Sequence, residues 1–251
     1  MDRKSQLETV DHSNFIFRES EWNSIPEINI PLLIILKTDH FGVEEQTRLS
    51  SFLSEDEIIK NRRFRFLRER TSYTVIHGLL RWILGKHLGI EPRTIDFKFG
   101  TNRKPYITGY TRNIFFTLSH SSGVSLLAFD PRNEIGADVE MIDQEFDYEP
   151  IVKRWFTQEE VRYIGQSKEI SRKRFYELWT RKEAYLKAIG EGITKNLSIE
   201  VLENKITNQS LVGNEGQHGD FILESMIYDR NYQITVALNE NSSKLRIFAI
   251  P

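Results

Sequence analysis

The sequence lacks cysteine altogether, so disulfide bonds, thiolate metal ligands, iron–sulfur clusters and a cysteine nucleophile are excluded. It also lacks a long hydrophobic run, because the longest one, Leu32–Leu36, is far too short to cross a bilayer. The first 31 residues have neither the charged start nor the apolar centre of a signal peptide. These absences predict a cytoplasmic protein without a membrane partner.

An excess of positive charge is missing as well. The 34 Lys and Arg residues against 36 Asp and Glu residues give a formal net charge of −2, which predicts no nucleic-acid partner. Any bound anion must therefore meet a local cluster of cations. The basic run Lys60–Arg70, with Phe64 and Phe66 between its cations, could be a nucleic-acid patch. Helical spacing offers a plainer account, in which Phe64 and Leu67 face the core and the arginines cover the outside.

The pattern of apolar residues predicts a mixed α/β protein in two halves. Residues 1–29 show no clean periodicity and are expected to form an N-terminal extension that is draped over the body or partly disordered. The turn-like segment Asp130–Asn133 separates an N-terminal α/β lobe at residues 30–130 from a C-terminal α/β lobe at residues 131–251. Strands are expected at 32–36, 97–99, 114–118, 124–129, 135–141, 221–226, 233–238 and 245–250. Helices are expected after the capping boxes Ser54–Glu57 and Thr157–Glu160 and over about 68–88 and 173–189.

The most informative pair of residues is Asp138 and Glu140. Alternate side chains of a strand project to the same face, so Ile135–Glu140 presents two carboxylates side by side. Two close negative charges need a neutralising partner, and oxygen ligands favour a hard cation such as Mg²⁺. Gly136 leaves room for the close approach of a ligand or another backbone. The alternative is that both carboxylates merely end a strand in solvent.

A second set of charged residues lies on the helix expected at 173–189. Glu183 and Lys187 are four residues apart, which permits either a surface ion pair or a third metal-binding carboxylate beside a phosphate-binding ammonium group. Lys182 falls inside the apolar stripe of this helix. Its ammonium group must therefore reach water along the surface or meet a fixed anion.

Two shorter segments are candidate anion contacts. Asn102–Pro105 places Lys104 in a turn stiffened by proline, and Ser119 with His120 stands where a strand gives way to a loop. Each segment alone is unspecific, since a basic turn is commonly solvated surface and a lone histidine is more often structural.

Taken together, five segments resemble motifs of the Sfp-type 4′-phosphopantetheinyl transferases in their order and spacing. They are Asn102–Pro105, Phe116–Ser121, Ile135–Glu140, Trp155–Glu160 and Trp179–Lys187. The resemblance covers roughly residues 52–192. It implies two similar lobes related by pseudo-twofold symmetry, with coenzyme A and Mg²⁺ in the cleft between them.

The same resemblance implies a role for each matching residue. Asp138, Glu140 and Glu183 match the family's metal-binding carboxylates, and Glu183 is the expected general base, directly or through a metal-bound water. Lys187 matches a lysine that meets the pyrophosphate. Coenzyme A contacts are expected at Lys104, Ser119, His120 and Lys182, with His120 at the 3′-phosphate, and Lys60 joins this phosphate site by a looser alignment.

The implied reaction transfers 4′-phosphopantetheine from coenzyme A to a serine of an apo acyl or peptidyl carrier protein and releases 3′,5′-ADP. Two lobes in one chain can build the cleft alone, so a monomer is expected. One alternative is a metal-dependent phosphohydrolase that uses the same carboxylates with water as nucleophile. Another is a non-catalytic carrier-protein or coenzyme A binding module. The extension 1–29 and the polar loop 208–220 match nothing in the family pattern.

Overall fold

The computed structural model describes residues 7–8, 16–19, 24–100, 102, 104–110, 112–165, 168–191, 199–207 and 219–250. Most of the expected extension 1–29, Arg103 of the basic turn and residues 208–218 of the expected loop lie outside the described residues. The described part confirms a mixed α/β protein. The pseudo-twofold relation between two lobes stays a prediction.

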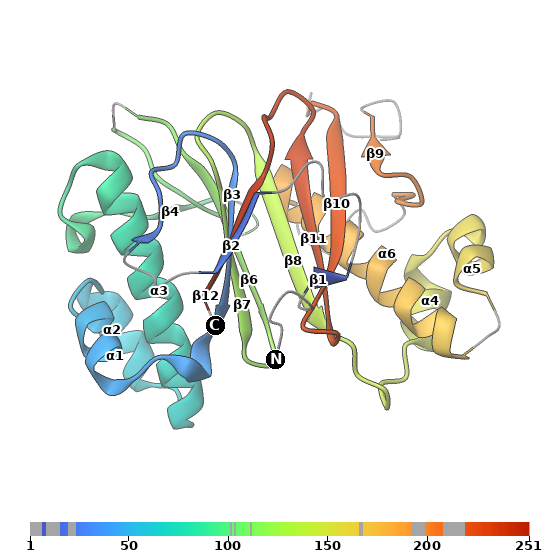
Figure 1. Ribbon diagram of the computed structural model, residues 1–251, viewed down its shortest axis with the longest axis horizontal. Helices are drawn as coiled ribbons and strands as arrows, with labels where there is room; N and C mark the ends of the chain where they lie inside the picture. The colour runs from blue at the N-terminus through green and yellow to red at the C-terminus, as the bar shows by residue number, and fades with distance from the viewer. Residues whose placement is uncertain are drawn as a thin grey trace.

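Two five-stranded sheets form the centre of the molecule (Figure 1). The first sheet has the order β2 (Ile16–Glu19), β12 (Arg246–Ile250), β3 (Leu32–Lys37), β7 (Val124–Asp130) and β6 (Phe115–Ser121). In the second sheet β10 (Phe221–Tyr228) pairs with β1 (Leu7–Glu8), β9 (Lys205–Ile206) and β11 (Tyr232–Asn239), and β11 pairs with β8 (Ile135–Met141). β4 (Lys98–Phe99) and β5 (Pro105–Tyr106) form a separate hairpin.

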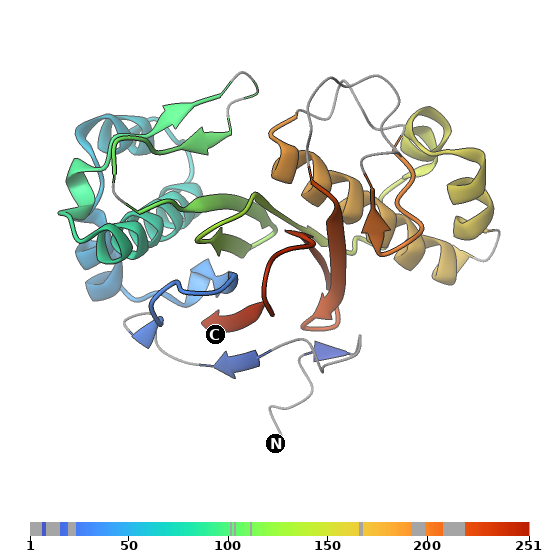
Figure 2. The same cartoon turned by 90° about the horizontal axis from the view of Figure 1, so that it is seen from above.

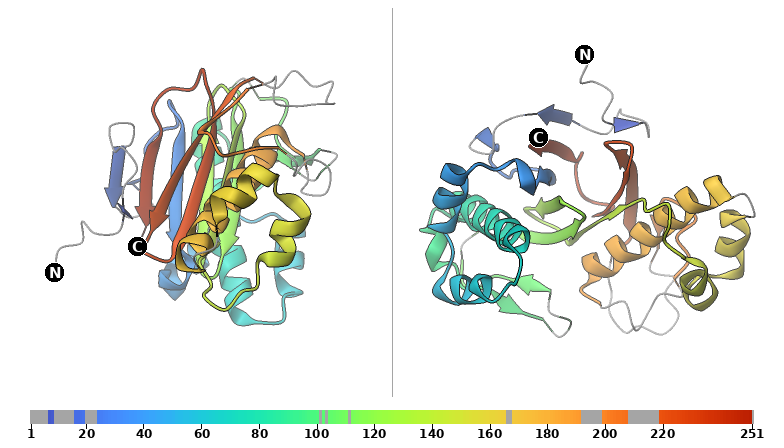
Figure 3. Two further views of the ribbon diagram at one scale, coloured as in Figure 1. Left: turned by 90° about the vertical axis from the view of Figure 1, so that its right-hand side faces the viewer. Right: turned by 90° about the horizontal axis from the view of Figure 1, so that it is seen from below.

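Helices cover the outer side of each sheet (Figure 2). The first sheet carries α1 (Val43–Ser50), α2 (Glu55–Arg62) and α3 (Leu67–Leu88), and the second carries α4 (Glu149–Trp155), α5 (Gln158–Ile164) and α6 (Lys168–Ile189). Short 3₁₀ turns occur at η4 (Thr38–His40) and η5 (Pro92–Thr94). Figure 3 shows the same layers from two further directions. Among the described residues, none of the helices combines the length and the apolar character needed to cross a membrane.

Three hydrophobic clusters follow from the alternation of side chains along the strands. In β3, Leu32 and Ile34 pack under α1 and α3, whereas Leu33 and Ile35 face the second sheet. The cluster between the sheets also takes Val139 of β8, and a third cluster lies between the second sheet and α6. The molecule is therefore layered as helices, sheet, sheet and helices.

The two ends of the chain cross over the expected boundary. β12, from the last residues, runs parallel to β3 within the first sheet, so residues 246–250 pair with the range 30–130. Of the extension, β1 pairs with β10 in the second sheet and β2 pairs with β12 in the first. The division into two lobes at residue 130 stays a prediction. The pairing of β12 with β3 means that the last strand of the predicted C-terminal lobe lies in the sheet of the N-terminal one.

The expected strands and long helices are present with small shifts at their ends, and both expected capping boxes form. The helices α1 and α4 were not predicted, because each buries a single residue, Leu49 or Val152, and so has no apolar stripe. The expectation that Leu67 faces the core is wrong. Leu67 is the first residue of α3 after the cap Phe66, and it is 77% exposed.

Candidate active site

The strand β8 turns two of its carboxylates toward α6. Ile135, Ala137 and Val139 point into the cluster between the sheets, so the alternate residues Asp138 and Glu140 lie on the opposite face. That face is covered by α6, the helix that carries Glu183 and Lys187. Residues that are about 45 positions apart in the sequence are thereby brought together.

Gly136 allows the helix to lie directly on the strand. A Cβ atom at this position would stand 1.9 Å from the carbonyl oxygen of Ala184 and 2.5 Å from the backbone nitrogen of Ala188. Any larger residue would push α6 away from β8. The room that the sequence analysis attributed to Gly136 is thus taken by another backbone.

Asp138 is the most enclosed of the carboxylates, with 3% of its surface exposed. Its Oδ1 accepts hydrogen bonds from Ser119 Oγ at 2.8 Å and from Lys187 Nζ at 2.6 Å, and Lys187 Nζ also donates to Ser119 Oγ at 2.8 Å. Its Oδ2 is buried and has no hydrogen-bond partner among the described residues. The alternative of a strand end in solvent is therefore wrong for Asp138.

Glu140 and Glu183 complete a group that we call the carboxylate cluster, Asp138, Glu140 and Glu183. Ser121 Oγ donates to Glu140 Oε2 at 2.9 Å, and burial, followed by the charge of Asp138, raises the pKa of Glu140. Glu183 is 7% exposed. Burial, followed by the charge of Asp138, raises the pKa of Glu183 to about 7, and Lys187 opposes the shift. The alternative of a surface ion pair is wrong, because Glu183 is buried and Lys187 pairs with Asp138.

The carboxylate cluster has the donor atoms of a divalent-cation site. The negative charge of Asp138 raises the pKa of Glu140 and of Glu183. One oxygen of the cluster, Asp138 Oδ2, is buried and has no hydrogen-bond partner among the described residues. Within the described ranges, no three side chains are already arranged as metal ligands, and Lys187 is the cation that neutralises Asp138. An all-oxygen donor set with surplus negative charge fits a hard cation.

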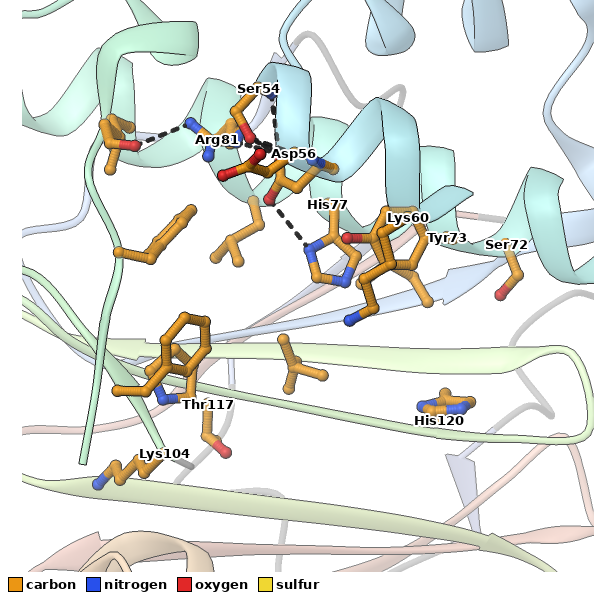
Figure 4. Close-up of a pocket in the computed structure, with 18 of the residues that line it drawn as sticks. Ser54, Asp56, Lys60, Ser72, Tyr73, His77, Arg81, Lys104, Thr117 and His120 are labelled. Atoms are coloured by element: carbon orange, nitrogen blue, oxygen red, sulfur yellow. Dashed lines mark hydrogen bonds and ion pairs between the residues drawn. The ribbon is translucent and has the colours of Figure 1, made fainter. Parts of the chain in front are cut away.

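Figure 4 shows a cavity of about 950 Å³. It is lined by Lys187, which pairs with Asp138, whereas the three carboxylates of the cluster do not line it. Four of the residues expected from the sequence line it, namely Lys60, Lys104, His120 and Lys187. In Figure 4, Lys60 of α2 lies on one side of the cavity. Lys104, just before β5, and His120 of β6 lie on the other side. A cavity of this size suits a nucleotide-sized ligand.

Lys104 ties the β4–β5 hairpin to the end of α6. Its Nζ donates to the carbonyl oxygen of Ala188 at 2.6 Å and pairs with Glu134. Lys104 is therefore half-buried and is not a solvated surface residue. His120 lines the cavity, where burial, followed by the positive charges of Lys187 and His77, lowers the pKa of its imidazole.

The expectation that Lys182 contacts coenzyme A is corrected by its position. Lys182 is 1% exposed and pairs with Glu160, which is 0% exposed, at 2.9 Å. Its Nζ also donates to the carbonyl oxygen of Ile199 at 2.5 Å and lies 5.1 Å from the ring centre of Phe156. Because successive residues of a helix point in different directions, Lys182 points away from its neighbour Glu183. The anion that pairs with Lys182 is Glu160, a residue of the protein and not a ligand.

Sequence reasoning missed one wall of the cavity. Tyr73, His77 and Arg81 line it from α3, and Glu57 lines it from α2. Arg81 Nε donates to Glu57 Oε2 at 2.5 Å. The spacing of four residues between Tyr73, His77 and Arg81 places them on one face of a helix, which is the signal that could have found them.

Comparisons with known proteins show which family the chain resembles. Residues 134–237 match the family model described as the 4′-phosphopantetheinyl transferase superfamily. The 4′-phosphopantetheinyl transferase HetI of Nostoc is 37% identical over 156 residues, which are 61% of this chain and 66% of HetI. A putative 4′-phosphopantetheinyl transferase of Synechocystis is 27% identical over 70% of this chain and 72% of its own length. The 4′-phosphopantetheinyl transferase Sfp of Bacillus subtilis is 27% identical over 77% of this chain and 85% of Sfp.

The names of these relatives describe them as 4′-phosphopantetheinyl transferases, in one case as a putative one. The chain spans about two thirds of the length of HetI. The matched segment 134–237 contains Asp138, Glu140, Glu183 and Lys187, the residues that β8 and α6 bring together. The chain contains a domain of the 4′-phosphopantetheinyl transferase superfamily, at residues 134–237.

Proposed function

We propose that this chain is an Sfp-type enzyme that transfers 4′-phosphopantetheine from coenzyme A to a serine of an apo acyl or peptidyl carrier protein. The observation that carries the proposal is the buried carboxylate cluster with Lys187 at the edge of the cavity. The cavity holds coenzyme A, and Lys187 meets its pyrophosphate. The nucleophile comes from the carrier protein.

In this reaction the serine oxygen forms a bond to the β-phosphorus of coenzyme A. The bond between that phosphorus and the bridging oxygen breaks, and 3′,5′-ADP leaves with the electron pair. The serine proton goes to Glu183, whose pKa of about 7 suits a general base at neutral pH. Lys187 stabilises the negative charge that develops on the leaving phosphate.

Asp138, Glu140 and Glu183 would hold a magnesium ion, which fits their oxygen donors and the Asp138 Oδ2 atom that has no hydrogen-bond partner among the described residues. When bound, the ion supplies charge neutralisation to the pyrophosphate. Coenzyme A contacts beyond Lys187 are proposed at Lys60, Lys104 and His120, which line the cavity. Ser119, also expected from the sequence to contact coenzyme A, is buried and donates to Asp138, so its proposed role is to hold that carboxylate in place. The monomeric state and the cytoplasmic location stay predictions.

Product analysis tests the proposal against the phosphohydrolase alternative. The enzyme is incubated with coenzyme A and Mg²⁺, with and without an apo carrier protein, and the small-molecule products are separated. A transferase forms 3′,5′-ADP only when the carrier is present. Free phosphopantetheine formed without a carrier would favour the hydrolase, and no turnover with any apo carrier would favour a binding module.

A further inference from the structure

Two serines of β6 each donate a hydrogen bond to one carboxylate of β8. β6 stands at one end of the first sheet and β8 at one end of the second, and the two strands lie side by side (Figure 1). Ser119 and Ser121 are two residues apart, so their side chains leave β6 on one face, as those of Asp138 and Glu140 leave β8. Ser119 Oγ donates to Asp138 Oδ1 at 2.8 Å, and Ser121 Oγ donates to Glu140 Oε2 at 2.9 Å. Hydroxyl groups of one sheet thus contact the carboxylates of the other.

The hydroxyl group of Ser121 is fixed as an acceptor and as a donor. The backbone nitrogen of Met141 donates to Ser121 Oγ at 3.1 Å. A serine hydroxyl has a single proton to donate, and that proton goes to Glu140. Because Met141 directly follows Glu140, one hydroxyl holds both the backbone and the carboxylate of the same short stretch of β8. Ser121 is not among the described residues that line the cavity, so contact with a substrate does not account for its position.

Asp138 and Glu140 differ in the charge of their hydrogen-bond donors. Asp138 is bound by the cation Lys187, whereas the donors to Glu140 are neutral, namely the hydroxyl of Ser121 and the indole of Trp179. Neutral donors orient a carboxylate without cancelling its charge. The charge of Glu140 therefore stays available to a metal ion, while the direction of its oxygens is set by the protein.

We propose that Ser121 is a positioning residue that orients the Glu140 carboxylate for binding of the magnesium ion and thereby raises the affinity of the carboxylate cluster for the metal. The inference rests on the proposed function, which supplies the metal. Hydrogen bonds to a ligating group commonly change metal affinity on the order of 10-fold to 100-fold. The lower end of this range applies here, because Trp179 still donates to Glu140 when Ser121 is removed.

Titration calorimetry with Mg²⁺ alone, without coenzyme A or a carrier protein, tests this inference. Ser121→Ala should raise the Kd for Mg²⁺ about tenfold. Ser121→Thr keeps the hydroxyl group and should bind Mg²⁺ as the wild type does. Ser125→Ala is the matched control and should also bind as the wild type does. Ser125 is a buried serine of the neighbouring strand β7, and its hydroxyl has no hydrogen-bond partner among the described residues.

Transfer assays give a second readout. Ser121→Ala should need more Mg²⁺ than the wild type to reach half of its maximal rate, and excess Mg²⁺ should restore transfer, because Glu140 itself is still present. The KM for coenzyme A should then equal that of the wild type. A loss of transfer that excess Mg²⁺ does not restore would contradict a role limited to positioning.

Thermal unfolding without metal shows whether each variant is folded. If Ser121→Ala does not fold, Ser121→Cys takes its place, because a thiol donates only weakly, and it should bind Mg²⁺ more weakly than the wild type. If the variant binds Mg²⁺ as tightly as the wild type and is only less stable, Ser121 serves the backbone of Met141 alone. This inference is then wrong, while the proposed function stands. If the wild-type protein binds no Mg²⁺, the metal site of the proposed function fails together with the inference.

Discussion

The ammonium group of Lys187 lies 2.6 Å from Asp138 Oδ1, while Asp138 Oδ2 is buried with no hydrogen-bond partner in the described part of the chain. One half of the carboxylate is thus neutralised by α6, and the other half is left for a ligand. Under the proposed function, the reactive end of the cavity lies at the contact between β8 and α6, where Lys187 lines the cavity. The first prediction concerns Asp138 itself.

Asp138→Asn should lower the rate of transfer by roughly a hundredfold or more, the scale of losing one electrostatic group in an active site. Asparagine keeps the shape and can still accept hydrogen bonds from Lys187 and Ser119, so the fold should remain. Steady-state transfer to an apo carrier measures the effect. Asp143→Asn, at an exposed position just after β8, is the control and should be fully active. Full activity of purified Asp138→Asn would contradict the site assignment.

Because the pKa of Glu183 is raised, we expect the stability of the folded protein to depend on pH in metal-free buffer. This pKa is about 7 in the folded protein and 4.5 in the unfolded reference, so between these values the folded state binds more protons. Stability should therefore fall as the pH rises from about 4.5 to about 7. Glu183→Gln removes this loss and should be more stable than the wild type at pH 8 by up to about 3 kcal/mol.

Urea unfolding of Glu183→Gln and of the wild type at pH 5 and pH 8, with a chelator present, measures this difference. The difference in the free energy of unfolding between the variant and the wild type should be small at pH 5 and large at pH 8. A difference in the free energy of unfolding that does not change with pH would show that ionisation of the buried Glu183 does not destabilise the fold.

Magnesium should stabilise the protein more at high pH than at low pH. Protons and a cation compete for Glu183 and Glu140, whose pKa values are both raised, so the ionised form needed for binding is scarcer at pH 6 than at pH 8. The shift in melting temperature on adding Mg²⁺ should accordingly be larger at pH 8. It should disappear in Asp138→Asn. An equal shift in that variant would place the cation elsewhere.

Lys182 should matter for folding and not for binding coenzyme A. Lys182→Met leaves Glu160 buried without its cation, which should cost about 3 kcal/mol of stability. The KM for coenzyme A should stay unchanged in the variant that remains folded. Lys173→Met, at an exposed position of the same helix, is the control and should change neither quantity. A raised KM with unchanged stability would restore Lys182 as a substrate contact.

Local patterns in the sequence predict what depends on neighbouring residues. The alternation along β8 correctly places Asp138 and Glu140 on one face, and the boxes Ser54–Glu57 and Thr157–Glu160 correctly mark the starts of α2 and α5. These features follow from strand geometry and helix capping, which act over a few residues.

Pairings between distant residues were not predictable in the same way. The partner of Lys182 is Glu160, 22 positions earlier, and no local period identifies it. The same holds for β12, which joins β3 across more than 200 residues of chain. Each such pairing is one of many that the sequence allows, and only the packing of the whole molecule selects it.

The most direct test of the proposed function is the mass of an apo carrier protein after incubation with the enzyme, coenzyme A and Mg²⁺. The carrier should gain the mass of one phosphopantetheine group at its serine, and a carrier with that serine changed to alanine should gain nothing. The gain should disappear with Glu183→Gln. An unchanged mass with every apo carrier protein tried, or an equal gain with the Glu183→Gln enzyme, would contradict the account.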